Sequence, residues 1–273
     1  MGSQQFNKLS HLTASSRARA LADMVEGPEL DVLVIGGGIT GAGIALDAAT
    51  RGLRTGIVEA GDWAAGTSAW SSKLIHGGLR YLYNLDFKLV AEALKERGLL
   101  LEKIAPHLVH AQPFLWPLKT PVIERSYSAI GIGMYDALAY IGSRGKKGVP
   151  SQRHFTKKGT KTVFPDIKDS AFTGAIQFYD ARVDDARLVV DVVRTASGYG
   201  ALAASRTQVV GIDKDTSGKV VGARLADLES GQELTVKAKH IINATGVWTE
   251  ESESLANPDA GLEVLASKGI HIV

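Results

Sequence analysis

Near the N-terminus, a short run of apolar residues is followed abruptly by three glycines. The run Asp31–Ile35, with the sequence DVLVI, is too short for a helix and predicts a buried strand of a parallel sheet. The alanine-rich segment 39–51 then predicts a helix. The β-branched run 55–58 predicts a second strand that ends at Glu59. This part of the chain therefore predicts a strand–turn–helix–strand unit.

The glycines in this turn have the G-x-G-x-x-G spacing of dinucleotide-binding proteins. Gly36 allows a tight turn, Gly38 allows the backbone to approach a pyrophosphate, and Gly41 allows helix and strand to pack closely. The first helical residues, Ile39 and Thr40, bring free N–H groups and the positive end of the helix dipole toward the phosphates. The spacing therefore predicts dinucleotide binding, and the alternative is a purely structural strand–turn–helix.

The acidic residue at the end of the second strand predicts which dinucleotide binds. A carboxylate at Glu59 can accept hydrogen bonds from both hydroxyls of a ribose. The same charge would repel a 2′-phosphate, which favours NAD or FAD over NADP. Ala60 follows directly and is expected beside the same nucleotide.

Apolar residues recur at helical spacing in several later segments. Asp86 can cap a helix that runs to Pro106, and a further helix is expected over 126–141. Asp184 can cap a helix within the run 178–193. Residues 17–25 predict a short amphipathic helix, and a docked helix and a frayed N-terminal arm are both open alternatives.

Other segments have the pattern of strands. The prolines of 113–121 favour an edge strand or a loop. Three β-type runs separated by DTSG and ESG predict a meander, and a further short strand leads into Ala244-Thr245-Gly246. The four expected strands are 207–212, 220–226, 233–236 and 241–243.

The loop after Glu59 carries an unusual set of side chains. Residues 60–82 are rich in glycine and serine but also contain Lys73, His76, Arg80 and Tyr81. A solvated surface loop is one interpretation. The other is a loop that lies along a cofactor, with hydroxyl donors near phosphates and basic groups near a reactive ring.

The segment 71–82, SSKLIHGGLRYL, closely resembles a signature of the FAD-dependent glycerol-3-phosphate dehydrogenases, and the resemblance extends from about Asp31 to the last residue. It implies an α/β fold: a Rossmann-like FAD-binding domain of the two-dinucleotide type with a β-meander, plus the start of a mixed substrate-binding domain. The glycines and Glu59 would hold the ADP half of FAD. Arg80, with Tyr81, would face the substrate phosphate. Residues expected near the pyrophosphate, ribityl chain and isoalloxazine are Thr67, Ser68, Ser72, Lys73, Leu74 and His76.

The A-T-G element resembles the return strand of two-dinucleotide flavoproteins, where the backbone passes close to the cofactor. It favours FAD over NAD and adds Ala244 and Gly246 to the expected cofactor contacts. Val209 is expected beside the adenine.

The resemblance implies oxidation of sn-glycerol 3-phosphate to dihydroxyacetone phosphate, with electrons passed to a quinone or another acceptor. His76 is the candidate for polarising the substrate hydroxyl or supporting the reduced flavin, and Arg80 is the candidate for binding the phosphate. Two alternatives stay open: another FAD-dependent amine or amino-acid oxidase, and an inactive FAD-binding fragment.

Composition limits the partners. A net charge of +2 gives no bulk electrostatic support for nucleic-acid binding, and the absence of cysteine excludes disulfides, Cys-ligated metals and thiol chemistry. His107 and His110 lack recognisable further ligands, so no metal site is expected. No apolar run has the length of a membrane span. We expect a cytoplasmic protein; peripheral contact with the inner face of the membrane and a homodimer stay open. The basic loop 143–161 is expected to be solvated, with contact to anionic lipid headgroups as the alternative.

The predicted domains are interleaved along the chain. Residues 1–27 are expected to form an N-terminal arm, and 28–112 with 172–251 the FAD-binding domain. Residues 113–171 and 252–273 would form part of a substrate-binding portion. The chain stops at LASKGIHIV, inside an apolar strand-like run, which is rare at the end of a domain. We therefore expect the sequence to be the N-terminal part of a longer protein.

Overall fold

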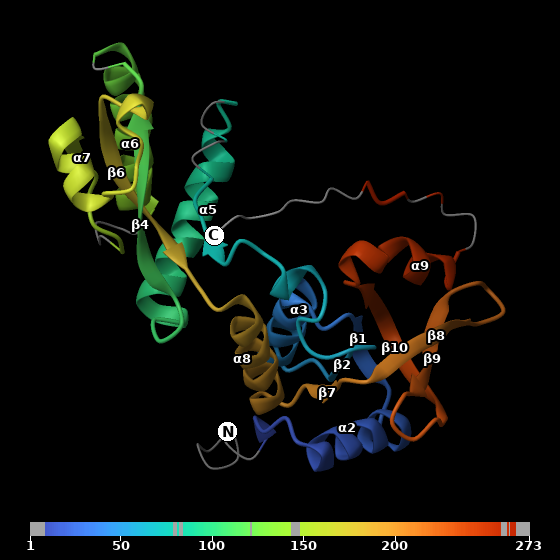
Figure 1. Ribbon diagram of the computed structural model, residues 1–273. Coiled ribbons are helices and arrows are strands. Elements are labelled where there is room, and N and C mark those ends of the chain that lie inside the picture. The colour runs from blue at the N-terminus through green and yellow to red at the C-terminus, as the bar shows by residue number, and fades with distance from the viewer. Residues whose placement is uncertain are drawn as a thin grey trace. The chain divides into compact units, whose positions relative to one another are not determined.

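The computed structural model divides into two compact units. Unit 1 comprises residues 1–72 and 185–273, and unit 2 comprises residues 73–184 (Figure 1). These boundaries differ from those of the predicted domains, but compactness does not test which portions bind a cofactor, so that assignment stays a prediction. The structure describes residues 9–78, 81, 84–120, 122–142, 148–257, 261 and 263–265.

Unit 1 is built on one six-stranded sheet with the order β7-β2-β1-β10-β9-β8. The predicted first strand, helix and second strand are confirmed as β1, α3 and β2. Strands β1, β2 and β7 run parallel to one another, and the second half of β10 runs parallel to β1. The elements are β1 Leu30–Ile35, α3 Ile39–Thr50, β2 Thr55–Val58, β7 Leu202–Ala204, β8 Thr207–Lys214, β9 Val220–Asp227 and β10 Glu233–Asn243.

Strand β10 belongs to two kinds of pairing at once. Its first half, Glu233–Lys237, is antiparallel to β9 and completes the predicted meander with β8. Its second half, Ala238–Asn243, is parallel to β1. The prediction of two separate strands over 233–236 and 241–243 was wrong, because no glycine or proline interrupts the chain between them.

Helices cover both faces of this sheet (Figure 1). On one face, α3 and α8 Asp185–Gly198 pack together through small and β-branched side chains, including Ala45, Val189 and Val193. The alanines of α3 let it lie close to the strands. On the other face, α2 Ala14–Glu26 buries Leu21 and Met24 against the strands.

Helix α2 resolves the open alternative for the N-terminal segment in favour of a docked helix. Thr13 and Ser16 form a capping box, in which the Ser16 amide donates to the Thr13 hydroxyl over 3.2 Å. The Arg17 guanidinium, with 11% of its side chain exposed, forms an ion pair with Asp227 at the end of β9. The helix is therefore held by both apolar burial and a specific polar contact.

Unit 2 contains an antiparallel sheet in which β6 is central and β4 lies at one edge. The edge position confirms the interpretation of the proline-rich segment 113–121, since a proline cannot donate to a neighbouring strand. The helix predicted over 126–141 is confirmed, and the helix predicted from the Asp86 cap to Pro106 is confirmed in its first part. The elements are β3 Leu74–Ile75, α5 Phe87–Leu99, β4 His110–Leu118, α6 Ile123–Gly142, β5 Arg153–Thr156, α7 Lys157–Val163 and β6 Gly174–Arg182.

Two predictions in unit 2 need correction. Asp86 does cap α5, accepting from the Leu89 amide over 3.1 Å, but the α-helix ends at Leu99 and a π-helix, η2 Leu100–Ile104, replaces its last turns. The segment 143–161, which we predicted to be a basic loop, also contains regular structure. It forms β5, which pairs with β6, and most of α7, whose N-cap is Thr156. Among the residues that the structure describes, the remaining short helices are η3 Asp169–Ala171 in unit 2 and η1 Thr67–Ala69, η4 Gly246–Trp248 and α9 Thr249–Ser254 in unit 1.

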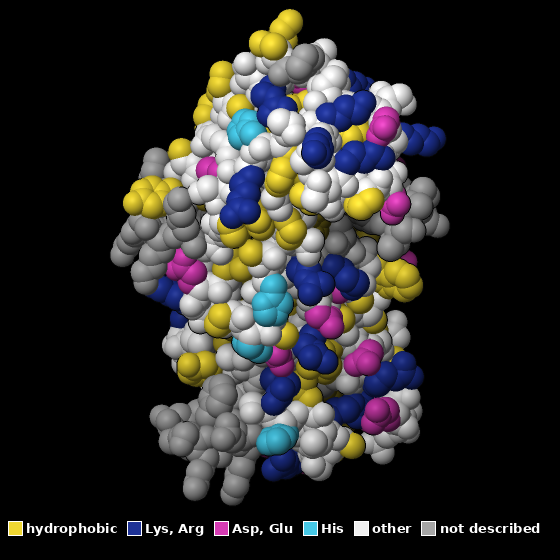
Figure 2. Space-filling model, turned by 60° about the vertical axis from the view of Figure 1, so that its left-hand side comes forward, with side chains coloured by type: hydrophobic (Ala, Val, Ile, Leu, Met, Phe, Trp, Pro, Cys, Tyr) yellow, Lys and Arg dark blue, Asp and Glu magenta, His cyan; other side chains and the backbone are white. Residues whose placement is uncertain are grey.

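The surface carries mixed charge. On the face shown in Figure 2, basic and acidic side chains are interspersed with apolar ones, in keeping with a net charge of +2. Within the ranges that the structure describes, no helix has the length and apolar character needed to cross a membrane. No three His, Asp or Glu side chains of those same ranges gather as a metal site would require.

The contact between α2 and β9 predicts a stability effect at low pH. Burial would raise the pKa of Asp227, but hydrogen bonds from Arg17, Ser230 and the Glu229 amide outweigh it and lower the pKa to about 2. A lowered pKa means that the carboxylate stabilises the fold above the ordinary pKa of 3.8 and that this contribution is lost as the pH falls toward 2.

We therefore expect Asp227→Asn to lower the free energy of unfolding by about 1–3 kcal/mol at pH 7, because it leaves Arg17 poorly paired. The difference in melting temperature from the unsubstituted protein should shrink as the pH is lowered from 4 to 2. Asp213→Asn, which removes a more exposed ion pair with Arg224, is the control and should have little effect. A pH-independent difference for Asp227→Asn would contradict this assignment.

Candidate functional site

The turn between β1 and α3 places two glycines where the protein's own backbone leaves no room for a side chain. Gly36 has a φ of +111°, and a Cβ there would lie 2.5 Å from the carbonyl oxygen of Ala244. A Cβ at Gly41 would collide with the carbonyl oxygen of Gly36. These two glycines are therefore required by the turn and by helix–strand packing.

Gly38 is different, because its surroundings are open. An added Cβ would meet one described neighbour within 4 Å, the Ser68 hydroxyl at 3.1 Å. Gly38 is the N-cap of α3 and offers no capping side chain, while the Ile39 amide donates to Ser68 over 2.9 Å. Ile39 and Thr40 are exposed. The missing side chain at Gly38 thus leaves space in front of a helix N-terminus, where a pyrophosphate would bind.

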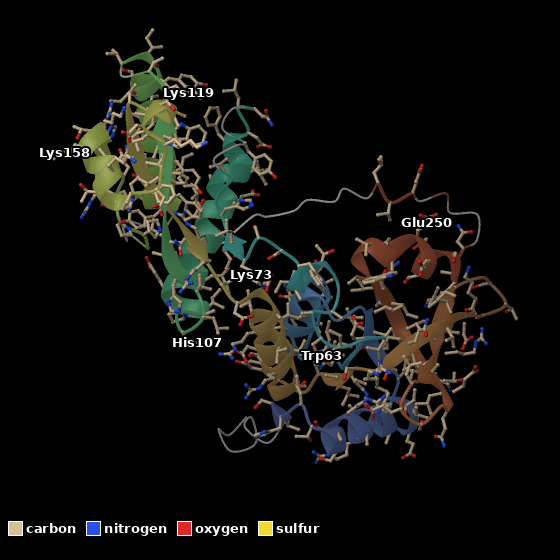
Figure 3. The ribbon with its side chains drawn as sticks, viewed as in Figure 1. Trp63, Lys73, His107, Lys119, Lys158 and Glu250 are labelled. Carbon is tan, nitrogen blue, oxygen red and sulfur yellow. The ribbon has the colours of Figure 1, made fainter. Side chains whose placement is uncertain are left out.

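Glu59 is held at the carboxyl end of β2 by two backbone amides. Its Oε2 accepts from the Gly37 amide over 2.6 Å, and its Oε1 accepts from the Gly61 amide over 2.7 Å. Each oxygen keeps further acceptor capacity, so the carboxylate can also accept ribose hydroxyls. The Trp63 ring, labelled in Figure 3, lies against Gly37, where a Cβ would be 2.6 Å from it.

The end of β10, which leads into the A-T-G element, lies beside the glycine turn. The Ala244 amide donates to the Ile35 carbonyl over 2.8 Å, which brings Ala244 beside the glycine turn. Asn243 then accepts from both the amide and the hydroxyl of Thr245. Gly246 has a φ of +59° and is exposed. Three strand ends thus meet at the Gly36 turn, as a doubly wound sheet requires of its binding crevice.

The remaining unit 1 residues that we predicted lie less centrally. Ala60, Thr67 and Ser72 are exposed on the loop that follows Glu59. Val209 is only 7% exposed and packs in the apolar core on the α2 side of the sheet, so its side chain is already in contact with protein. An adenine contact at this position would have to use the backbone.

The predicted residues of unit 2 follow one another around β3. Lys73 has a φ of +58°, and its carbonyl accepts from the Val183 amide over 2.9 Å. Leu74 pairs with Arg182 in the sheet, and His76 is exposed just after the strand. Tyr81 packs partly buried against an apolar cluster of α5 and α6. Arg80 lies outside the described residues.

A buried polar network fixes the backbone next to His76. The Gly77 amide donates to the Tyr135 hydroxyl over 2.7 Å, and that hydroxyl donates to Asp180 over 2.7 Å. Arg97, 2% exposed, forms an ion pair with the same carboxylate. Burial raises the pKa of Tyr135 far above its ordinary value, and the Asp180 charge adds to the effect, so the phenol stays protonated and serves as a donor.

The sequence patterns missed several residues that shape these two regions. Gly37 was visible as the middle of three glycines, but its role as a donor to Glu59 depends on a strand some twenty residues away. Tyr135 lay within a predicted apolar helix and carried no separate signal. Asp180 lay in the run 178–193, within which we predicted a helix.

Comparison with known proteins identifies the family to which the chain belongs. The model of the FAD dependent oxidoreductase family (DAO) matches residues 31–273. The chain is 49% identical over 245 residues to glycerol-3-phosphate dehydrogenase 2 of Mycobacterium tuberculosis, which covers 90% of this chain and 41% of that protein. It is 42% identical over 270 residues to the mitochondrial glycerol-3-phosphate dehydrogenase of Mus musculus, covering 94% of this chain and 36% of the relative.

A solved structure of another glycerol-3-phosphate dehydrogenase is also similar to this chain. The glycerol-3-phosphate dehydrogenase from Bacillus halodurans, complexed with FAD, matches with a TM-score of 0.67 at 30% identity, over 90% of this chain and 40% of that chain. The chain thus spans less than half the length of each of these three relatives.

The matches confirm the resemblance stated from the 71–82 segment, the predicted fold class and FAD as the family's cofactor. They cover both the glycine turn and the return strand at Ala244. The chain belongs to the FAD dependent oxidoreductase family.

Proposed function

We propose that the protein oxidises sn-glycerol 3-phosphate to dihydroxyacetone phosphate, with FAD as its cofactor. The observation that carries the proposal is the open turn at Gly38 beside the amide-held Glu59, in a chain 49% identical to a glycerol-3-phosphate dehydrogenase. The chain spans 41% of that relative, so the activity is proposed for the whole protein to which these residues belong.

The residues of unit 1 would hold the ADP half of FAD. The N-terminus of α3, at Ile39 and Thr40, would face the pyrophosphate, and the Ser68 hydroxyl, which accepts from the Ile39 amide, would lie beside the same phosphates. Glu59 would accept hydrogen bonds from the ribose hydroxyls. Ala244 and Gly246 would bring backbone close to the cofactor.

The substrate is a small alcohol with a phosphate dianion. Arg80 would recognise that phosphate through two parallel N–H bonds, a geometry that lysine cannot reproduce. Tyr81 would assist from the next position, with its ring anchored in the apolar cluster of α5 and α6. Recognition of the phosphate orients the carbinol carbon for reaction.

Oxidation of the alcohol removes a hydride from carbon and a proton from the hydroxyl. When bound, FAD supplies the two-electron acceptor for the hydride. His76 would take the proton, because it is exposed and an imidazole nitrogen that carries no hydrogen can act as a general base toward the substrate hydroxyl. The Gly77 amide, held by Tyr135, fixes the backbone on which His76 is carried.

The electrons would then pass to a quinone or another acceptor. A quinone acceptor would require peripheral contact with the inner face of the cell membrane, and we propose this location with a cytoplasmic body for the protein. A homodimer is compatible with this scheme, and no nucleic acid takes part. The oxidation of glycerol 3-phosphate proceeds in the same way whichever acceptor receives the electrons.

We expect the visible spectrum of the protein, prepared from its complete reading frame, to show an oxidised flavin that bleaches on anaerobic addition of glycerol 3-phosphate. Glycerol and an amino-acid mixture are the controls and should leave the spectrum unchanged. Bleaching by amino acids would favour the alternative amine or amino-acid oxidase. A flavin that no substrate reduces would indicate an inactive binding protein, and reoxidation by a quinone analogue or by oxygen would identify the acceptor.

Arg80→Lys should raise the KM for glycerol 3-phosphate roughly tenfold or more, because one of two charge-assisted hydrogen bonds is lost. Flavin content should not change, since the residue is assigned to the substrate. Steady-state kinetics with glycerol 3-phosphate measures the effect, and Lys88→Arg on α5 is a charge-preserving control. An unchanged KM would remove Arg80 from the substrate site.

His76→Ala should slow anaerobic flavin reduction by about 10²–10⁴-fold, the usual contribution of a positioned general base. Stopped-flow absorbance at saturating substrate measures the rate directly and separates it from reoxidation. His107→Ala is the control among the other histidines. A normal reduction rate in His76→Ala would assign the base to another residue.

A further inference from the structure

Helix α2 lies before the region that matches the family, which begins at residue 31, yet it contacts the segment that supports the nucleotide site. Its Arg17 extends across the β7–β8 turn at residues 205–207. Arg17 Nε donates to the Ser205 carbonyl over 2.7 Å, and Nη2 donates to the Arg206 carbonyl over 3.0 Å. These contacts are additional to the ion pair with Asp227.

The turn that Arg17 holds has a strained backbone. Arg206 has a φ of +52°, in the left-handed region that a non-glycine residue rarely adopts. Such a conformation persists where neighbouring contacts hold it. Arg17 accounts for two of those contacts, because its guanidinium donates to the carbonyl of Ser205, which precedes Arg206, and to the carbonyl of Arg206 itself.

The same turn is the main-chain partner of Glu59. The Glu59 amide donates to the Ala204 carbonyl over 3.0 Å, and the Thr207 amide donates to the Glu59 carbonyl over 2.8 Å. The Arg206 amide donates to the Gly61 carbonyl over 3.0 Å, and the Gly61 amide in turn binds the Glu59 carboxylate. A continuous chain of hydrogen bonds thus leads from Arg17 through the turn to the acidic group.

We propose that Arg17 is a positioning residue for the adenosine end of the cofactor. By binding the 205–207 turn, it holds the backbone of Glu59–Gly61 and so fixes the carboxylate in the orientation that a ribose diol needs. The inference rests on FAD binding and deepens the proposed function. It does not depend on which substrate the enzyme oxidises.

The test compares the dissociation constants of FAD and of an FAD analogue that lacks the 2′-hydroxyl of the adenosine ribose. Titration of the apoprotein, followed by flavin fluorescence, gives both values. Arg17→Met keeps the length of the side chain and removes its donors. Arg19→Met is the matched control, because Arg19 is exposed on the same helix and donates to the Ser15 carbonyl of its own helix. Glu59→Gln is the reference for loss of the ribose contact.

We expect Arg17→Met to bind FAD about tenfold more weakly than the unsubstituted protein, the effect of losing roughly one strong hydrogen bond. The deoxy analogue should lose clearly less affinity than FAD does in Arg17→Met, and likewise in Glu59→Gln, because only its 3′-hydroxyl is left to contact Glu59. Arg19→Met should behave as the unsubstituted protein. A purely structural role for Arg17 would weaken the binding of FAD and of the deoxy analogue equally, so a larger loss of affinity for FAD distinguishes the positioning role.

Equal weakening of both ligands would overturn the proposal and assign Arg17 to fold stability alone, and so would unchanged FAD affinity. If Arg17→Met does not fold, Arg17→Lys replaces it, because a lysine can pair with Asp227 but cannot bind both turn carbonyls. If FAD binds and glycerol 3-phosphate fails to reduce it, the proposed substrate is wrong and the inference on Arg17 stands. If the unsubstituted apoprotein binds no FAD, both are wrong.

Discussion

The reversal of the backbone at Gly36 is the constraint on which the rest of unit 1 depends. At this point β1 ends, α3 begins and the carbonyl of Ala244 arrives from the end of β10. A side chain at Gly36 would have to displace either β10 or the turn itself, and one at Gly41 would push α3 away from β1. The close packing of these three backbones is what leaves the N-terminus of α3 facing outward, with Ile39 and Thr40 exposed.

Features set by nearby residues could be predicted from the sequence. The glycine spacing, the Asp86 cap of α5 and the edge position of the proline-containing β4 all follow from local stereochemistry. The turns of the meander are of the same kind. In the DTSG turn, Asp215 accepts from the amides of Ser217 and Lys219, the short-range contact that makes aspartate common in turns.

Features set by distant partners could not be predicted. The three residues of β7 are too few to give a periodic signal, and they form a strand because β2 lies beside them. The same holds for the site. Glu59 was identified from its spacing, whereas the amides of Gly37 and Gly61 that orient its carboxylate depend on the folded path of the loop. The docking of α2 likewise depends on Asp227, which no pattern near Arg17 indicates.

The double pairing of β10 has a consequence for how the chain folds during synthesis. β1 is made early, but one of its two neighbours is β10; Asp31 and Lys239, which form an ion pair across this contact, are 208 positions apart. One edge of this apolar strand must therefore stay open until the whole of unit 2, and the part of unit 1 from Asp185 to β10, have been synthesised. Non-local parallel pairing of this kind folds slowly and exposes an aggregation-prone edge. The nascent protein is thus expected to depend on chaperones until β10 closes the sheet.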